Sequence, residues 1–554
     1  MKTIIPCKNL LIIYTLAVFT VSVSSVSLAH DGPHEDEDMI LSELGNLGTV
    51  SFKVSCDAEA QEGINIGVAI FHHMMYAQAE KHYQELIQSK PDCAMAYWGY
   101  AMTLFHPLWP DTISQDALER GQNAVNKART FTQASEREKM YIKAAAAYYD
   151  NWQTTSDKDR VKAWGKVQEM IHKAYPDDID AAAIYALSKL TTASPSDQSF
   201  NQQRRAGEIL DRLYKLAPLH PGVIHYTIHA YDNGMLAHKA VQAARDYDQI
   251  APDVPHSLHM PSHIFIRLGM WSDVVSWNIR SAKAALKYPT KGSTTLHYVH
   301  ALDYMTYANL QISEDIKAAQ TIKEIENHHN HQDTFPAAYA LAAMPARFAL
   351  ERQDWQLAKD SPIRKPVYIS WDNYPHAEAM TYYARGLGAI RSGDLEATKL
   401  ELKKLDQLYQ KTLKTDPSYW AVLLKAQYDT VAAWQTYAKG DVKAALAQLR
   451  IAADLEDSME KNPVTPGAVM PSRELLGDML VLNQDYENAL AAYEKTLAMT
   501  PNRLNSILGA GLCHEKLGND IAAKKYYSLL DELKVSELSE RMNVVAARAY
   551  LSAD

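Results

Sequence analysis

From about residue 60 onward, apolar positions recur at helical spacing in segments separated by short turns. This pattern predicts a succession of helix–turn–helix units along nearly the whole chain. No Gly/Ser linker divides the pattern, and its longest interruptions, residues 193–199 and 361–375, are typical of loops. A separate apolar run, residues 10–26, lies near the N-terminus.

The helical units repeat with a period of about 34 residues. Small, alanine, aromatic and proline positions recur at fixed spacings near both ends of the chain: Gly67, Ala79, Tyr83 and Pro91; Gly477, Ala489, Tyr493 and Pro501; and then, in register, Gly511, Ala523 and Tyr527. These positions resemble the tetratricopeptide repeat (TPR) superfamily, whose unit has a small residue at position 8, Ala at 20, an aromatic at 24 and Pro at 32.

The resemblance implies an all-α fold, a TPR-like right-handed superhelix of stacked antiparallel helical hairpins. One hairpin cannot bury its apolar face alone, so neighbours stack and share a core. We count about eleven hairpins. The expected organisation is a signal peptide at 1–29, a largely disordered acidic leader at 30–58, a TPR-like helical-repeat array at 59–535 and a C-terminal capping helix at 536–554.

The first residues have the pattern of a secretory signal. Lys2 and Lys8 precede the apolar run, and Ser27-Leu28-Ala29 offers small residues where a signal peptidase cuts. We expect cleavage after Ala29 and an exported protein, periplasmic or secreted, with no stable membrane span after cleavage. The alternative is an uncleaved membrane anchor.

Composition narrows the function classes. Hydrophobic residues make up 47%, with 22 Gly and 23 Pro, which suits a folded helical protein. Without Lys2 and Lys8 the formal charge of −10 becomes −12. No basic patch stands out, so nucleic acid is not an expected partner. There is no GxSxG motif and no phosphate-binding glycine loop.

Three cysteines follow the signal segment. Cys56 and Cys93 flank the first predicted hairpin, where export would place them in an oxidising compartment. A disulfide between them and two free thiols are both open alternatives. Cys513 lies in an apolar helical stretch and is expected to be a core residue.

Histidines concentrate between residues 220 and 303. His225 and His229 are four residues apart, as are His259 and His263, so each pair shares one helical face. The TPR resemblance implies that these pairs occupy the same two positions of consecutive first helices, facing a concave groove. The candidate ligand-binding groove contains His225, His229, Asp232, His256, His259, His263, Arg267, His300, Asp303 and Arg347.

Three interpretations of this cluster stay open. The histidines are structural, or they hold a transition metal, or they line an anion- or small-molecule-binding groove with Arg267, Arg347 and Tyr226. Neutral imidazoles with a carboxylate suit zinc, copper or iron. The expected metal ligands are His225, His229, His259, His263, His300 and Asp303.

These observations favour an exported TPR-repeat binding protein whose His-rich groove, about residues 220–305, binds a small-molecule or peptide ligand, through a transition metal in the second interpretation. One alternative is a metal-dependent enzyme in which the ion activates water and Asp232 or Asp303 assists. The other is a protein–protein interaction scaffold without metal, and a repeat fold alone does not decide between them.

Overall fold

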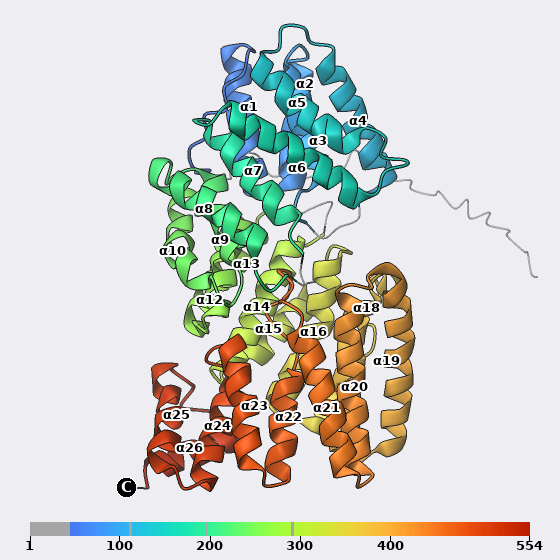
Figure 1. Ribbon diagram of the computed structural model, residues 1–554, viewed down its shortest axis with the longest axis vertical. Helices are drawn as coiled ribbons and strands as arrows, with labels where there is room; N and C mark the ends of the chain where they lie inside the picture. The colour runs from blue at the N-terminus through green and yellow to red at the C-terminus, as the bar shows by residue number, and fades with distance from the viewer. Residues whose placement is uncertain (1–44, 110–112, 195–196, 290–292, 329, 554) are drawn as a thin grey trace, which may run out of the picture. The chain divides into compact units, whose positions relative to one another are not determined.

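The structure is a computed structural model that describes residues 45–109, 113–194, 197–289, 293–328 and 330–553. The chain divides into two units, residues 1–37 and 38–554. The predicted signal peptide lies outside the described residues, and all that follows concerns the second unit (Figure 1).

The predicted all-α fold of stacked antiparallel helix pairs is confirmed (Figure 1). In the N-terminal part of the array the helices are α1 (Ala58–His72), α2 (Tyr76–Ser89), α3 (Ala94–Phe105), α4 (Gln115–Arg129), α5 (Glu136–Tyr149), α6 (Asp157–Ala174), α7 (Ile179–Thr191) and α8 (Asn201–Leu216). Several begin at a capping side chain that accepts a backbone N–H, such as Asp57 for α1 and Ser135 for α5.

The middle of the chain carries the histidines. Its helices are α9 (Pro221–Tyr231), η2 (Ala237–Ala240), α10 (Val241–Ile250), α11 (Pro255–His259), α12 (Pro261–Arg267), α13 (Trp271–Ala285), α14 (Leu296–Gln311), α15 (Asp315–Asn327), α16 (Phe335–Glu351) and α17 (Trp355–Lys359). Pro261 separates α11 from α12, because proline cannot donate the backbone bond that would continue the helix.

The C-terminal part continues the pairing. It comprises η3 (Trp371–Asn373), α18 (Pro375–Arg391), α19 (Leu395–Thr415), α20 (Trp420–Ala438), α21 (Val442–Asp457), α22 (Ser472–Leu482), α23 (Tyr486–Met499), α24 (Leu504–Lys516), α25 (Asp520–Glu532) and α26 (Met542–Leu551). No helix in the described ranges combines the length and the apolar character needed to cross a membrane.

Close helix approach explains the repeating small residue. A methyl group at Gly67 would lie 2.5 Å from Cζ of Tyr83. The same relation joins Gly477 to Tyr493 and Gly511 to Tyr527, at 2.7 and 2.3 Å from Cε1 of each ring. Position 8 is therefore small because the aromatic ring of position 24 occupies the space where a side chain would stand.

First helices of successive hairpins also contact one another, as in α14 with α16, α16 with α18 and α18 with α20. The array then turns back on itself. Trp271 Nε1 donates to the carbonyl of Asn502 at 2.8 Å, and Arg541 pairs with Asp315 at 2.5 Å. In Figure 1 the C-terminal helices α22–α24 accordingly lie beside α14 and α16. The sequence pattern predicted the hairpins but not the contacts between the C-terminal helices and the middle of the chain.

The loop of residues 458–471 lies against the His-bearing helices. Tyr304 of α14 donates to the carbonyl of Pro463 at 2.9 Å, and Arg347 of α16 donates to that of Gly467 at 2.9 Å. Arg267 of α12 pairs with Glu460. The loop thus contacts α12, α14 and α16 at Arg267, Tyr304 and Arg347.

The segment before α1 differs from the expected disordered leader. In its described portion, residues 45–57, Phe52 is fully buried and stacks on Trp98 with ring centroids 5.1 Å apart. Thr49 N donates to the carbonyl of Leu219 at 2.8 Å. Because an aromatic side chain and a backbone amide find partners on the helices, this portion packs on them. Cys56 and Cys93 are joined by a disulfide.

Candidate metal centre

Four helices in the middle of the array bring the predicted histidines together. α9 carries His225 and His229, α11 carries His256 and His259, α12 carries His263, and α14 carries His300. α9 contacts α12, and α11 contacts α14, so the histidine faces meet in the interior. The histidines sort into two groups of three, which we name triad A (His225, His229 and His256) and triad B (His259, His263 and His300).

Triad B is compact and enclosed. The Nε2 atoms of His259 and His263 lie 3.0 Å apart, and the rings of His259 and His300 have centroids 4.2 Å apart. One ligand nitrogen from each ring lies within 4.8 Å of the others. All three side chains are buried, with at most 6% exposed.

The hydrogen bonds of triad B define its tautomers. His263 Nδ1 faces Asp232 Oδ2 at 2.9 Å, and the ring must donate if the carboxylate is ionised. His259 Nδ1 faces Asn278 Oδ1 at 2.7 Å. The orientation of the Asn278 amide follows from its own bond, because Asn278 Nδ2 donates to the carbonyl of Val274 at 2.7 Å. In the neutral rings, both Nε2 atoms therefore carry lone pairs and face each other.

Burial of triad B favours this neutral state. Burial would raise the pKa of Asp232, but Lys461, Arg267 and His263 hold it well below its ordinary value. Burial lowers the pKa of His263, although Asp232 opposes the shift. Burial lowers the pKa of His259 further, with His300 and His263 adding to the effect. Neutral imidazoles are the form that binds metal ions.

Tyr304 and Lys461 complete the surroundings of triad B. The Tyr304 ring lies with its centroid 4.6 Å from that of His259 and 5.4 Å from that of His263. Lys461 donates to the carbonyl of Thr465 at 3.0 Å and lies 3.7 Å from Asp232. Burial lowers the pKa of Lys461 to about 8. The loop of residues 458–471 thus supplies a cation that pairs with the carboxylate behind His263.

Triad A adjoins triad B. His225 Nε2 lies 3.2 Å from His229 Nε2, and His225 Nδ1 donates to the carbonyl of His72 at 2.7 Å. His256 is 5% exposed, and its ring centroid lies 5.0 Å from that of His225. Burial lowers the pKa of His229 to about 3.

Three residues of the predicted ligand-binding groove, Asp303, Arg347 and Arg267, form ion pairs within the protein. Asp303, expected to be a metal ligand, forms a buried ion pair with Arg347, and neither triad includes it. Arg347 is fully buried and also donates to Gly467, while Arg267 binds Asp232 and Glu460. Both arginines therefore have protein carboxylates as partners.

A third His/Asp group includes residues that the sequence analysis did not select. His72 Nε2 and His220 Nε2 both donate to Asp180 Oδ1, at 2.9 and 3.2 Å. Tyr226 Oη donates to His72 Nδ1 at 2.9 Å, since that nitrogen is the acceptor when Nε2 carries the proton. In this network the Asp180 carboxylate accepts from both rings and Tyr226 donates to His72, which favours a structural role for these histidines, although His220 Nδ1 has no partner among the described residues. Asp180 carries no sequence signal, because only the fold brings α7 to α1.

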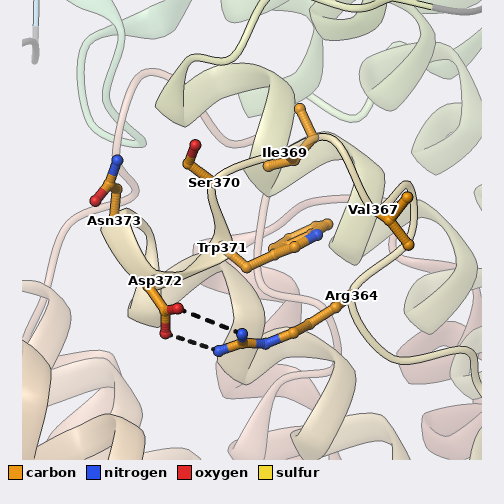
Figure 2. A pocket seen from close by; sticks show the side chains of 7 residues that line it. All are labelled: Arg364, Val367, Ile369, Ser370, Trp371, Asp372 and Asn373. Atoms are coloured by element: carbon orange, nitrogen blue, oxygen red, sulfur yellow. Dashed lines mark hydrogen bonds and ion pairs between the residues drawn. The ribbon is translucent and has the colours of Figure 1, made fainter.

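A surface pocket lies in the predicted loop at 361–375. Its volume is about 530 Å³, and its lining includes Arg364, Trp371 and Asp372. Figure 2 shows the ion pair that crosses it, in which Arg364 Nη2 lies 2.9 Å from Asp372 Oδ1. The pocket includes none of the predicted site residues, and its arginine already has two carboxylate partners, Asp372 and Glu378.

The fold and the two triads define a class: an all-α array of helical hairpins with histidine triads enclosed between its first helices. No protein-family model matches the chain, and no curated protein matches it. Among solved structures it is similar to the APC/C hetero-tetramer Cut9–Hcn1, with 13% identity, a TM-score of 0.34 and coverage of 92% of this chain and 79% of that one. It is also similar to a human IFIT1 dimer with m7Gppp-AAAA, with 10% identity, a TM-score of 0.35 and coverage of 80% and 90%.

Proposed function

We propose that this chain is an exported, TPR-like metal-binding protein that holds a transition-metal ion at triad B. The observation that carries the proposal is the 3.0 Å separation of His259 Nε2 and His263 Nε2, with each Nδ1 already bonded to another acceptor. Two lone pairs facing at this distance repel unless a cation lies between them. A metal bonded to both nitrogens at about 2.0–2.1 Å would bring them to about this distance.

The donor set indicates the kind of ion. Three imidazole nitrogens and no thiolate suit zinc, copper, iron or nickel rather than calcium or magnesium. The bonds from His263 to Asp232 and from His259 to Asn278 fix ring orientation, as such partners do in metal sites. Export is supported by the N-terminal signal pattern and by the Cys56–Cys93 disulfide, since disulfides persist in oxidising compartments.

A metal-dependent enzyme is the second candidate, and the ligand count of triad B favours it. Three protein ligands leave a coordination position for water, as in catalytic zinc sites. A bound ion would lower the pKa of that water and supply a nucleophile. The Tyr304 ring packs against the rings of His259 and His300, while its hydroxyl is held by the carbonyls of Pro463 and Thr465.

The test combines metal analysis with substitutions that spare the outer hydrogen bonds. In His259→Asn and His263→Asn the amide nitrogen can take the place of Nδ1 while the Nε2 ligand is lost. Metal-stripped protein is titrated with Zn²⁺ and Cu²⁺, and bound metal is measured after gel filtration. We expect tight binding in the unaltered protein and loss of at least one equivalent in the double variant.

The matched control is His82→Gln. His82 is also buried, but its Nε2 bonds the carbonyl of Gly63 at 2.6 Å, and a glutamine amide can keep that bond. This variant should bind metal like the unaltered protein. A folded, unaltered protein that binds neither ion would overturn the proposal.

A further inference from the structure

We infer that triad A holds a second transition-metal ion next to the one at triad B, so that the two triads form a two-metal centre. The inference rests on the proposed function for its neighbouring ion, but its evidence comes from other residues. It assigns His225, His229 and His256 as nitrogen ligands of a zinc- or copper-class ion.

The first observation concerns His225. A backbone carbonyl cannot donate, so the 2.7 Å bond from His225 Nδ1 to His72 O places the proton of the neutral ring on Nδ1. His225 Nε2 then carries a lone pair, which points at His229 Nε2, 3.2 Å away. α9 thus presents two ring nitrogens, one turn apart, at a separation that one ion can bridge.

The second observation concerns His256. Neither ring nitrogen of this buried side chain has a hydrogen-bond partner within the described part of the chain. A buried imidazole without partners is costly, because it gives up its bonds to water and receives nothing in return. Its ring faces that of His225, so an ion at triad A would take one of these unpaired nitrogens as a ligand.

The His72/Asp180/His220 group provides an internal comparison. It has a similar number of ligand atoms within reach of one another. There, however, the Asp180 carboxylate accepts from both rings and Tyr226 donates to His72. Triad A contains no carboxylate: its rings meet nitrogen to nitrogen, and a cation would serve His225, His229 and an unpaired nitrogen of His256 together.

The two ions would lie close together. The ring centroids of His229 and His263 are 6.0 Å apart, and those of His256 and His259 are 6.4 Å apart. A metal bonded to a ring nitrogen lies roughly 3 Å from the ring centroid, given bonds of about 2.0–2.1 Å. Two ions held by facing rings of different triads are therefore separated by about 12 Å at most.

Copper(II) is the probe for both the number of ions and their separation. Metal-stripped full-length protein is titrated with Cu²⁺, and the bound ions are counted and examined by electron paramagnetic resonance. We expect two tightly bound equivalents, with dipolar broadening of the spectrum at full loading. Addition of one equivalent to a single-triad variant should give the narrower spectrum of an isolated ion.

The variants separate the two proposals. His225→Asn can keep the bond to His72 O and removes a ligand of triad A, and His256→Phe removes the unpaired nitrogens while retaining an aromatic ring. Each should reduce binding from two equivalents to one, as should His259→Asn/His263→Asn. Circular dichroism and thermal melting verify folding, and His256→Phe decides the result if His225→Asn does not fold.

Each other outcome overturns the inference. If triad B variants lose the only equivalent and triad A variants lose none, the proposed function stands without a second ion. If either set of variants abolishes all binding, both triads serve one shared ion. Two equivalents without broadening would place the ions too far apart for one centre, and a protein that binds no copper or zinc overturns both proposals.

Discussion

His259 and His263 present their Nε2 atoms to each other at 3.0 Å although each ring has an acceptor for its Nδ1 proton. The acceptors come from two different elements, Asn278 of α13 and Asp232 at the end of α9. Both hold the rings in the ligand tautomer. Metal affinity should therefore depend on residues that never touch the ion.

Asn278→Ala is the sharpest test of this dependence. It removes the acceptor of His259 Nδ1, so the ring can rotate or change tautomer. We expect metal affinity at triad B to fall about 10- to 100-fold, and stability without metal to fall by about 1–3 kcal/mol because a buried donor loses its partner. Competition with a chromophoric chelator measures the affinity.

Asn278→Asp keeps an acceptor for His259 Nδ1 but loses the donor to the Val274 carbonyl, so its stability should fall while the ring stays oriented. Its affinity should stay near that of the unaltered protein or exceed it. Equal affinity in the alanine and aspartate variants, both folded, would show that Asn278 has no role in orienting the ring.

Gly67→Ala tests the small-residue rule of the repeats. The added methyl would lie 2.5 Å from the Tyr83 ring, which is itself buried, so one of the two helices has to move. Overpacking of this kind costs about 1–3 kcal/mol. The midpoint of urea unfolding should fall accordingly.

The control for this substitution is Gly165→Ala, in the interior of α6. There the nearest side-chain atoms, those of Ser188, would be 3.5 Å from the methyl, which is an ordinary contact. We expect a gain of about 0.5–1 kcal/mol, because glycine loses more backbone freedom than alanine on folding. A similar loss of stability in both variants would contradict the packing explanation.

The Gly67–Tyr83 relation also shows what the sequence could predict. Packing within one hairpin depends on residues close in sequence, so helical periodicity predicted the hairpins and the pairs His225/His229 and His259/His263. Each pair does bring its nitrogens to 3.0–3.2 Å. For His225 and His229, which share α9, spacing of four on a helix favours this geometry without tertiary information. His259 and His263 lie on either side of the break at Pro261, and Asn278 and Asp232 orient their rings.

The remainder depended on contacts between distant segments. His72 meets Asp180 across 108 positions, and Arg267 meets Glu460 across 193. Neither the helical period nor the repeat period predicts contacts between residues so far apart in the sequence. For the same reason the sequence did not show that the stacking of α14 on α16 pairs Asp303, a predicted metal ligand, with Arg347. The division into two triads also required the relative placement of α9, α11, α12 and α14.

The Cys56–Cys93 disulfide should contribute substantially to stability. It closes a loop over a sequence separation of 37 residues. By the loop-entropy relation, this corresponds to about 4 kcal/mol. Calorimetry with and without dithiothreitol should show a lower melting temperature for the N-terminal helices on reduction.

Two variants make this measurement specific. Cys56→Ser/Cys93→Ser should melt like the reduced protein and should not respond to dithiothreitol. Cys513→Ala, which removes the buried free thiol, should keep the full response. A double variant that melts at the temperature of the unaltered, oxidised protein would show that the bridge adds no stability.

Glu456 should make stability depend on pH. Burial raises the pKa of this carboxyl from its ordinary value of 4.5 to about 7, although Ser472 N donates to it at 2.6 Å. Between these values the unfolded chain has lost the proton and the folded protein keeps it. The folded state binds more protons there, so stability falls as pH rises from about 4.5 to about 7 and then levels off. The total loss is on the order of 3 kcal/mol.

Glu456→Gln should remove this part of the pH dependence, because the amide stays neutral at every pH and its oxygen can still accept from Ser472. Urea unfolding is measured at intervals from pH 4.5 to 8. The free energy of unfolding of the variant should rise relative to that of the unaltered protein as pH rises. Glu487→Gln, on the exposed first turn of α23, should follow the unaltered protein. Parallel curves for all three proteins would mean that Glu456 is ionised in the folded state throughout this range.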